Sequence, residues 1–177
     1  VKAEPKNLQG VKLHQLYFGR YLLFFVLGQI QALVVVLGDI YLLHCQILDK
    51  GLFWFTASLT SFVFTLLVYS LTLSFGDIGK AVAVVIMVIQ IAGSGGTFPI
   101  ELLPSVYRNI YIFFPFPYAI NAMRETIGGM YGNMYVKSLL QLMIFAVAAL
   151  VLGLVIRKPF IKWNRFVEKR MEDTKMM

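Results

Sequence analysis

The chain has 177 residues, of which 59% are hydrophobic and 14% charged, and its formal net charge is +7. A soluble domain is about 45–50% apolar and about 25% charged, so this composition excludes an ordinary water-soluble globular domain. The single cysteine, Cys45, excludes an internal disulfide and a cysteine metal cluster. The chain opens on Val1 without a signal-peptide pattern, and we expect it to be part of a longer protein.

Residues 1–20 are mixed and basic, and they predict a cytoplasmic amphipathic segment that lies on or near the membrane. Pro5 and Asn7 can start a short helix there, whose apolar residues would be Val11, Leu13, Leu16 and Tyr17.

Four apolar runs predict membrane-spanning helices, because a bilayer core of roughly 30 Å needs about 20 apolar residues. The expected spans cover residues 21–43, 52–75, 81–92 and 138–156, within a membrane domain of residues 21–156. In the second run, Thr56, Thr60, Ser61 and Thr65 share one helical face. Small polar residues on one face predict close packing against another helix.

Polar side chains inside the runs are the candidate intramembrane polar residues: Gln31, Asp39 and Gln90. An ionisable group within a span is a functional candidate by default, because its burial in lipid is costly. Asp39 has a plainer interpretation, since it lies within about one turn of the outer interface and near Lys50. For the glutamines, including Gln29, we expect hydrogen bonds between helices, with substrate contact as the alternative.

Residues 93–125 predict an outward re-entrant helical hairpin. A run of glycines and serine ends the third span, and the prolines that follow exclude a straight helix. Irregular backbone at membrane depth is tolerated only where protein or a wet cavity satisfies it. The break is a helix end and also a candidate movable gate, with these residues: Gly93, Ser94, Gly95, Gly96, Pro99, Pro104, Pro115 and Pro117.

The distribution of basic residues predicts the orientation. With four spans, one side receives residues 1–20, the turn at Lys80 and the basic amphipathic tail of residues 157–177, which we expect in the headgroup layer. That side holds 12 of the 16 lysines and arginines, and the other side holds 4. The positive-inside rule therefore places both ends of the chain in the cytoplasm. The basic residues flank apolar runs, which favours the bilayer surface over nucleic acid as a partner.

Enzymatic chemistry has little support in the sequence. No phosphate loop of the form GxxxxGK[ST] is present, so we expect no ATP hydrolysis by this chain. The two histidines, His14 and His44, fall on opposite sides of the predicted membrane, and no cofactor or metal site is expected.

Two segments resemble the YhgE/Pip family, the phage infection protein group. Residues 93–125 read GSGGTFPIELLPSVYRNIYIFFPFPYAINAMRE, and residues 18–43 read FGRYLLFFVLGQIQALVVVLGDIYLL. In its membrane part this family is similar to type-2 ABC exporter permeases. The resemblance implies an all-α integral membrane fold in the bacterial cell membrane, with about four transmembrane helices that are the last four of six spans.

The same resemblance implies partners. A permease of this kind works as a homodimer or a pair, and residues 1–17 would occupy the place of the coupling helix that touches a separate nucleotide-binding ATPase. The substrate would be hydrophobic or polymeric. Family members are not reliably accompanied by an ATPase in the same chain, which leaves an alternative: a membrane anchor of a phage receptor or of a type VII secretion-like scaffold.

Overall fold

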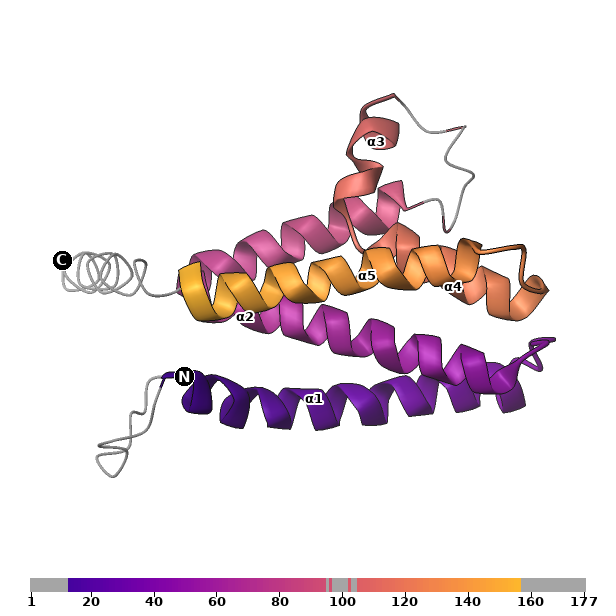
Figure 1. Cartoon of the computed structure of the whole chain (residues 1–177), viewed down its shortest axis with the longest axis horizontal. Coiled ribbons are helices and arrows are strands. Elements are labelled where there is room, and N and C mark those ends of the chain that lie inside the picture. The colour runs from indigo at the N-terminus through magenta and orange to yellow at the C-terminus, as the bar shows by residue number, and fades with distance from the viewer. Residues whose placement is uncertain (1–12, 95, 97–101, 103–104, 157–177) are drawn as a thin grey trace.

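The computed structural model describes residues 13–94, 96, 102 and 105–156. This part of the chain is helical and contains no strand (Figure 1). Three of its helices are long and apolar enough to cross a membrane: His14–Leu42, Lys50–Ile91 and Met134–Val155. The predicted all-α membrane fold is therefore confirmed. The segments expected at residues 1–12 and in the tail at 157–177 lie outside the described residues.

The first helix, α1, runs from Leu13 to Leu37 and continues as a π-helix, η1, from Gly38 to Leu42. It starts before residue 21, where we expected the first span, because its first turns pack against α2. Tyr17 is fully buried there and Tyr21 is 6% exposed. The end of the segment predicted at residues 1–20 is thus part of the bundle.

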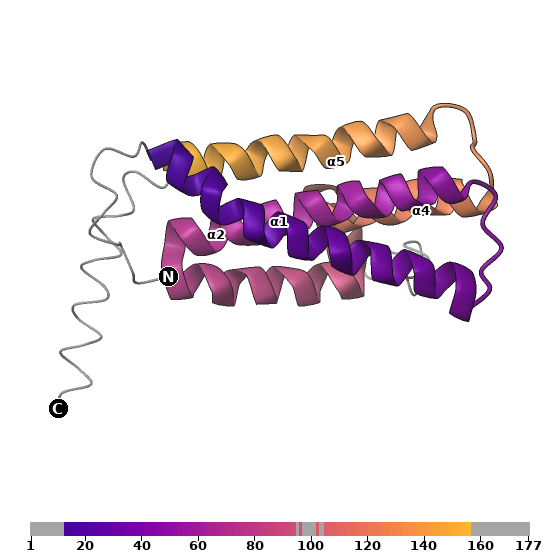
Figure 2. The same ribbon diagram turned by 90° about the horizontal axis from the view of Figure 1, so that it is seen from below.

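The second helix, α2, spans Lys50–Gly93 and carries two of the expected spans within one element. Gly76 has φ 62° and ψ −132° in its middle, and the helix reverses there into two limbs that run side by side (Figure 2). A Cβ at Gly79 would overlap the carbonyl group of Leu71, so the reversal is tight enough to require glycine. Three long helices are counted instead of four because this one element reverses.

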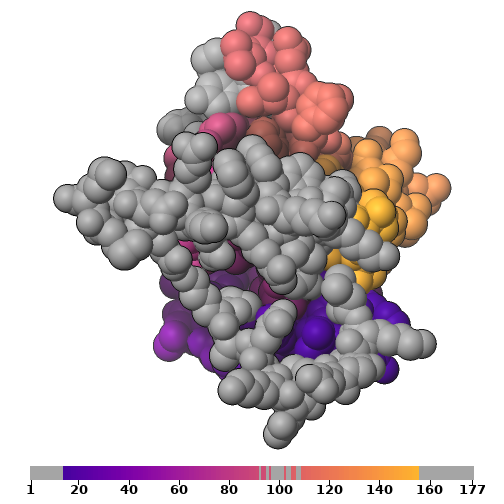
Figure 3. All heavy atoms as spheres, turned by 90° about the vertical axis from the view of Figure 1, so that its left-hand side faces the viewer, coloured from indigo at the N-terminus to yellow at the C-terminus, as the bar shows by residue number. Residues whose placement is uncertain are grey.

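The short helices come next: α3 (Ser105–Ile110), the 3-10 helix η3 (Tyr111–Phe113) and α4 (Phe116–Gly128). At 1.5 Å per residue α4 is about 20 Å long, too short to cross a bilayer core of roughly 30 Å. It packs against α2 and α5. In contrast, α3 projects away from the long helices, as Figures 1 and 3 show.

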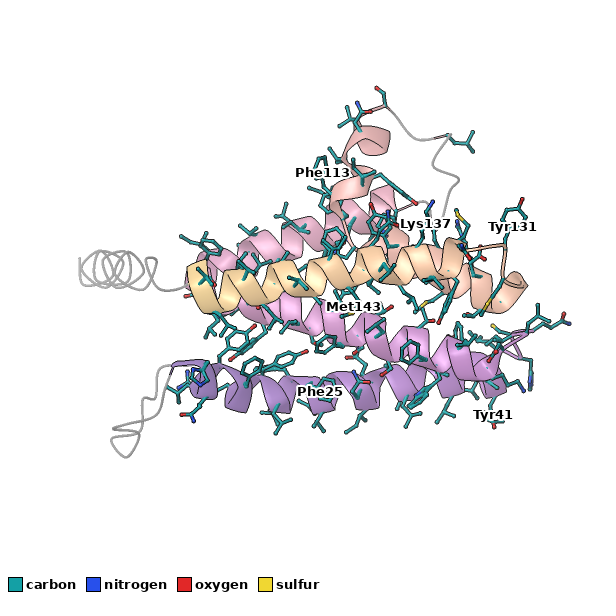
Figure 4. All side chains as sticks on the ribbon, viewed as in Figure 1. Phe25, Tyr41, Phe113, Tyr131, Lys137 and Met143 are labelled. Carbon is teal, nitrogen blue, oxygen red and sulfur yellow. The ribbon has the colours of Figure 1, made fainter. Side chains whose placement is uncertain are left out.

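The last helix, α5, spans Met134–Val151 and continues as a π-helix, η4, from Leu152 to Ile156. The start of α1, the reversal in α2 and the end of η4 lie at one end of the bundle (Figures 1 and 2). Tyr41 and Tyr131, which are 69% and 80% exposed, lie toward the opposite end (Figure 4). The main core joins α1, α2, α4 and α5 through these buried side chains: Tyr17, Tyr21, Val63, Leu66, Ala119, Leu142, Ala146 and Ala149.

Candidate functional site

A polar seam joins α1 to the first limb of α2. The amide of Gln29 donates to the carbonyl oxygen of Ser58 at 3.1 Å and accepts a short hydrogen bond from the Ser58 hydroxyl. Ser61 donates to the carbonyl oxygen of Gly28 at 2.8 Å. A Cβ at Gly28 would lie 2.9 Å from both Ser61 and Thr65, so the helices approach closely. Of the predicted small polar face, Ser61 and Thr65 pack against α1, and the interhelical hydrogen bond of Gln29 is confirmed.

The same limb of α2 also contacts α5, closer to the start of the limb. The buried hydroxyl of Thr56 lies 3.0 Å from that of Tyr135 and donates to the carbonyl oxygen of Leu52 at 2.8 Å. Thr60, one turn later, differs: its shielded hydroxyl oxygen has no partner among the described residues.

A cluster of tyrosines and small residues ties together the end of the bundle where α1 begins. The hydroxyl of Tyr17 lies 2.7 Å from that of Ser70, and Tyr69 donates to the carbonyl oxygen of Tyr17 at 3.0 Å. Ser74 donates to the carbonyl oxygen of Leu152 at 3.1 Å, which brings η4 into the cluster.

We did not predict this tyrosine cluster from the sequence. The spacing of Tyr17 and Tyr21 was the available signal, since tyrosines four residues apart share a helical face. Their partners on α2 and η4 lie far away in the chain, so the spacing alone does not identify them.

The break that ends α2 packs against α4. Gly93 and Ser94 are buried, and the hydroxyl of Ser94 donates to the carbonyl oxygen of Ile91 and accepts from the backbone N–H of Gly96 at 3.3 Å. A Cβ at Gly96 would lie 2.9 Å from the side chain of Ile120 in α4. The other candidate gate residues of this stretch, Gly95, Pro99 and Pro104, lie outside the described residues.

Two prolines of the candidate gate form the start of α4. Pro115 is its N-cap residue and Pro117 lies in its first turn, where a missing backbone N–H costs least. Both are buried. Between them, the ring of Phe116 packs edge-on against Phe64 of α2, with ring centroids 5.6 Å apart. The first turn of α4 therefore contacts the first limb of α2, while the next turn contacts the broken end of the second limb.

The three intramembrane polar candidates lie in different surroundings, and the structure does not bring them together as one site. Gln31 is exposed on α1. Asp39 is partly buried in η1, and its backbone oxygen accepts from the N–H of Cys45 at 3.0 Å. Gln90 is 3% exposed, and its side-chain oxygen has no hydrogen-bond partner in the part of the chain that the structure describes.

The candidate coupling residues lie at or before the start of α1. Leu13 begins the helix, Leu16 is half-buried in it, and Val11 lies outside the described residues. Within the described ranges, no group of three or more histidine, cysteine, aspartate or glutamate side chains is placed to hold a metal ion.

Comparison with known proteins identifies a family to which the chain is similar. A family model described as "ABC-2 family transporter protein" matches residues 6–155. The chain is also similar to "Uncharacterized protein YhgE" of Bacillus subtilis (strain 168), with 32% identity over 120 residues. The aligned part makes up 67% of this chain and 16% of that relative, so the chain spans a small fraction of the relative's length. No solved structure matches. The resemblance drawn from residues 18–43 and 93–125 is confirmed.

Proposed function

Because the chain belongs to the ABC-2 transporter family, we propose that it is a permease domain that exports a hydrophobic or polymeric substrate with energy from a separate ATPase. Two copies, or this chain and a second permease, would form the pathway. Both ends of the chain would face the cytoplasm, and residues 93–125 would form an outward re-entrant hairpin.

The observation that carries the proposal is the contact between the broken end of α2 and α4. Gly96 approaches Ile120 so closely that a Cβ would lie 2.9 Å away. A helix of about 20 Å packed against a helix break can shift without unfolding a span. Such a junction suits a gate that opens toward the outside, and two further candidate gate residues, Pro115 and Pro117, lie at the start of α4.

The ATPase that supplies the energy would bind at the end of the bundle opposite the gate. Val11, Leu13 and Leu16 would bind the ATPase, and the tyrosine cluster would connect this segment to the long helices. Tyr17, one residue after Leu16, is fully buried against α2. A movement of the N-terminal segment therefore reaches the bundle through direct contacts.

The partner can be tested by purifying the full-length protein from its native membrane in mild detergent, followed by mass spectrometry. We expect a stoichiometric nucleotide-binding subunit that is lost when Val11, Leu13 and Leu16 are changed to aspartate. Leu48→Asp, at a site 74% exposed in the loop before α2, is the control that adds the same charge outside the spans and should keep the subunit. A preparation that contains secretion components and no ATPase would favour the scaffold alternative and contradict the proposal.

The gate can be tested separately with the Gly95→Leu/Gly96→Leu double variant. The leucine at position 96 would collide with Ile120, and the glycine run would lose its freedom to bend. We expect normal membrane insertion and retained ATPase binding, but loss of the ATP hydrolysis that substrate movement stimulates in the complex. Unchanged stimulation would argue against a gate at this position.

A further inference from the structure

Two polar atoms inside the bundle lack a hydrogen-bond partner among the described residues: the hydroxyl oxygen of Thr60 and the side-chain amide oxygen of Gln90. Both atoms are shielded from the molecular surface. An unpaired buried polar group costs about 1–3 kcal/mol, and in a bilayer no surrounding water replaces the missing partner. Such groups are rare in native proteins, and an ordered water or ion is among the explanations for them.

The free atom of Thr60 lies beside the contact of α4 with the first limb of α2. Thr60 is one helical turn before Phe64, so the two side chains share a face. Phe64 packs against Phe116 in the first turn of α4. Thr56, one turn before Thr60, contacts Tyr135 of α5, so Thr60 lies between the contact of this limb with α5 and its contact with α4.

Gln90 has the corresponding position on the second limb. It is one turn before Ser94 on the same face, and the Ser94 hydroxyl accepts from the N–H of Gly96, which lies against Ile120. Ile120 and Phe116 are one turn apart on α4 and share a face. The two unpaired atoms thus flank one junction, where a single face of α4 contacts both limbs of α2.

Elsewhere in the bundle comparable side chains are paired. Gln29 bonds to Ser58 in both directions, and Ser61 bonds to the backbone of Gly28. The α1 seam therefore shows how this fold satisfies an intramembrane glutamine when a neighbouring helix supplies the partner. No described helix supplies one to Gln90.

We propose that Thr60 and Gln90 form a binding site for a hydroxyl-bearing group of an amphiphilic substrate, at the junction of α2 and α4. The free oxygen of Gln90 only accepts hydrogen bonds, and the Thr60 hydroxyl donates or accepts, so a ligand hydroxyl group has the chemistry that each atom requires. A cationic donor fits less well, because no carboxylate lies nearby in sequence on either limb and an unpaired charge at this depth is costly. This inference rests on the proposed transport function and narrows its substrate class.

The test uses the full-length protein in phosphatidylcholine nanodiscs, with and without monoglucosyl diacylglycerol as the hydroxyl-bearing probe. We expect the probe to raise the thermal unfolding midpoint of the wild type by about 3 °C. In the Thr60→Val/Gln90→Leu variant the probe should produce no rise. The matched control is Gln31→Leu, which removes an exposed glutamine from α1 and should respond to the probe as the wild type does.

The outcomes separate a substrate site from bound water. Without the probe, the double variant should unfold at the wild-type temperature or higher, because apolar replacements remove the two unsatisfied groups. A wild type that does not respond to the probe, together with a stabilised double variant, would identify a water site and overturn the inference. An equal response in all three proteins would overturn it too, because the probe would then bind elsewhere.

Two further measurements distinguish a failure of this binding site from a failure of the proposed transport function. If the double variant does not fold, the single variants Thr60→Val and Gln90→Leu should each reduce the probe's effect, and a full effect in both would contradict the site. Recovery of the ATPase from the native membrane tests the partner that the proposed function requires, and it does not use the probe. An ATPase that co-purifies with a protein indifferent to the probe would remove this inference and leave the proposed function intact.

Discussion

At Gly153 a single methyl group is excluded by an aromatic ring. A Cβ there would lie 2.5 Å from the ring of Tyr17 and 2.8 Å from its hydroxyl oxygen. Tyr17 is fully buried and hydrogen-bonded to Ser70, so its ring has no free space to move into. The glycine therefore permits η4 to close over the start of α1.

We expect Gly153→Ala to destabilise the protein by about 1–3 kcal/mol through overpacking. The measurement is thermal unfolding in detergent. Gly19→Ala is the matched control, because no described atom lies within 4 Å of its Cβ position. That control should be neutral or stabilising by up to about 1 kcal/mol, as expected for alanine in a helix. Equal effects of the two variants would contradict the close contact.

Tyr17→Phe tests the hydrogen bond without changing the ring. Loss of the 2.7 Å contact with Ser70 should cost about 1 kcal/mol of stability. Tyr131→Phe, at a side chain 80% exposed, should leave the unfolding midpoint unchanged. If Tyr17→Phe unfolds at the wild-type temperature, the hydroxyl pair contributes nothing measurable.

At the scale of elements, α2 depends on two glycines that act in different ways. Gly76 supplies a backbone conformation with positive φ, which other residues rarely adopt. Gly79 supplies space, because Leu71 presents its carbonyl group where a side chain would begin. The second limb returns along the first only if both conditions hold.

Gly79→Ala should therefore cost at least about 3 kcal/mol, since backbone cannot move aside as a side-chain end can. We expect a lower unfolding midpoint and new protease cleavage near the reversal. Gly38→Ala, in η1 with no described atom within 4 Å of its Cβ position, should produce neither change. Wild-type protease resistance in Gly79→Ala would show that the limbs separate at little cost.

At the scale of the whole molecule, the bundle has two distinct ends. One end holds the start of α1, the reversal in α2 and the end of η4 (Figure 1). The other end holds Tyr41 of η1 (Figure 4), and exposed Cys45 follows four residues later in the chain. The proposed orientation places the first end in the cytoplasm, in agreement with the excess of basic residues that the sequence predicts for that side of the membrane.

A membrane-impermeant maleimide tests this orientation in intact cells. We expect it to label Cys45 from outside, and we expect the Cys45→Ser variant to lose the label on the peptide that contains this position. In that variant background, Lys80→Cys, at the exposed reversal of α2, should react only after the membrane is permeabilised. The reverse labelling pattern would invert the topology.

The sequence by itself determined that this is a helical membrane protein and that a helix ends at the glycine run beginning with Gly93. Each is a local property, because hydropathy and helix propensity depend on residues close together in the chain. The sequence also predicted that Ser61 and Thr65 face another helix, since a helical face follows from spacing alone.

Only the tertiary structure decided which polar groups are paired. Gln29 and Gln90 look alike in the sequence, yet the first is bonded to Ser58, while the side-chain oxygen of the second has no partner among the residues that the structure describes. The contact of Gly153 with Tyr17 is equally invisible in the sequence. The physical reason is that pairing depends on the rotation and register of helices, which are determined by packing between residues far apart in the chain.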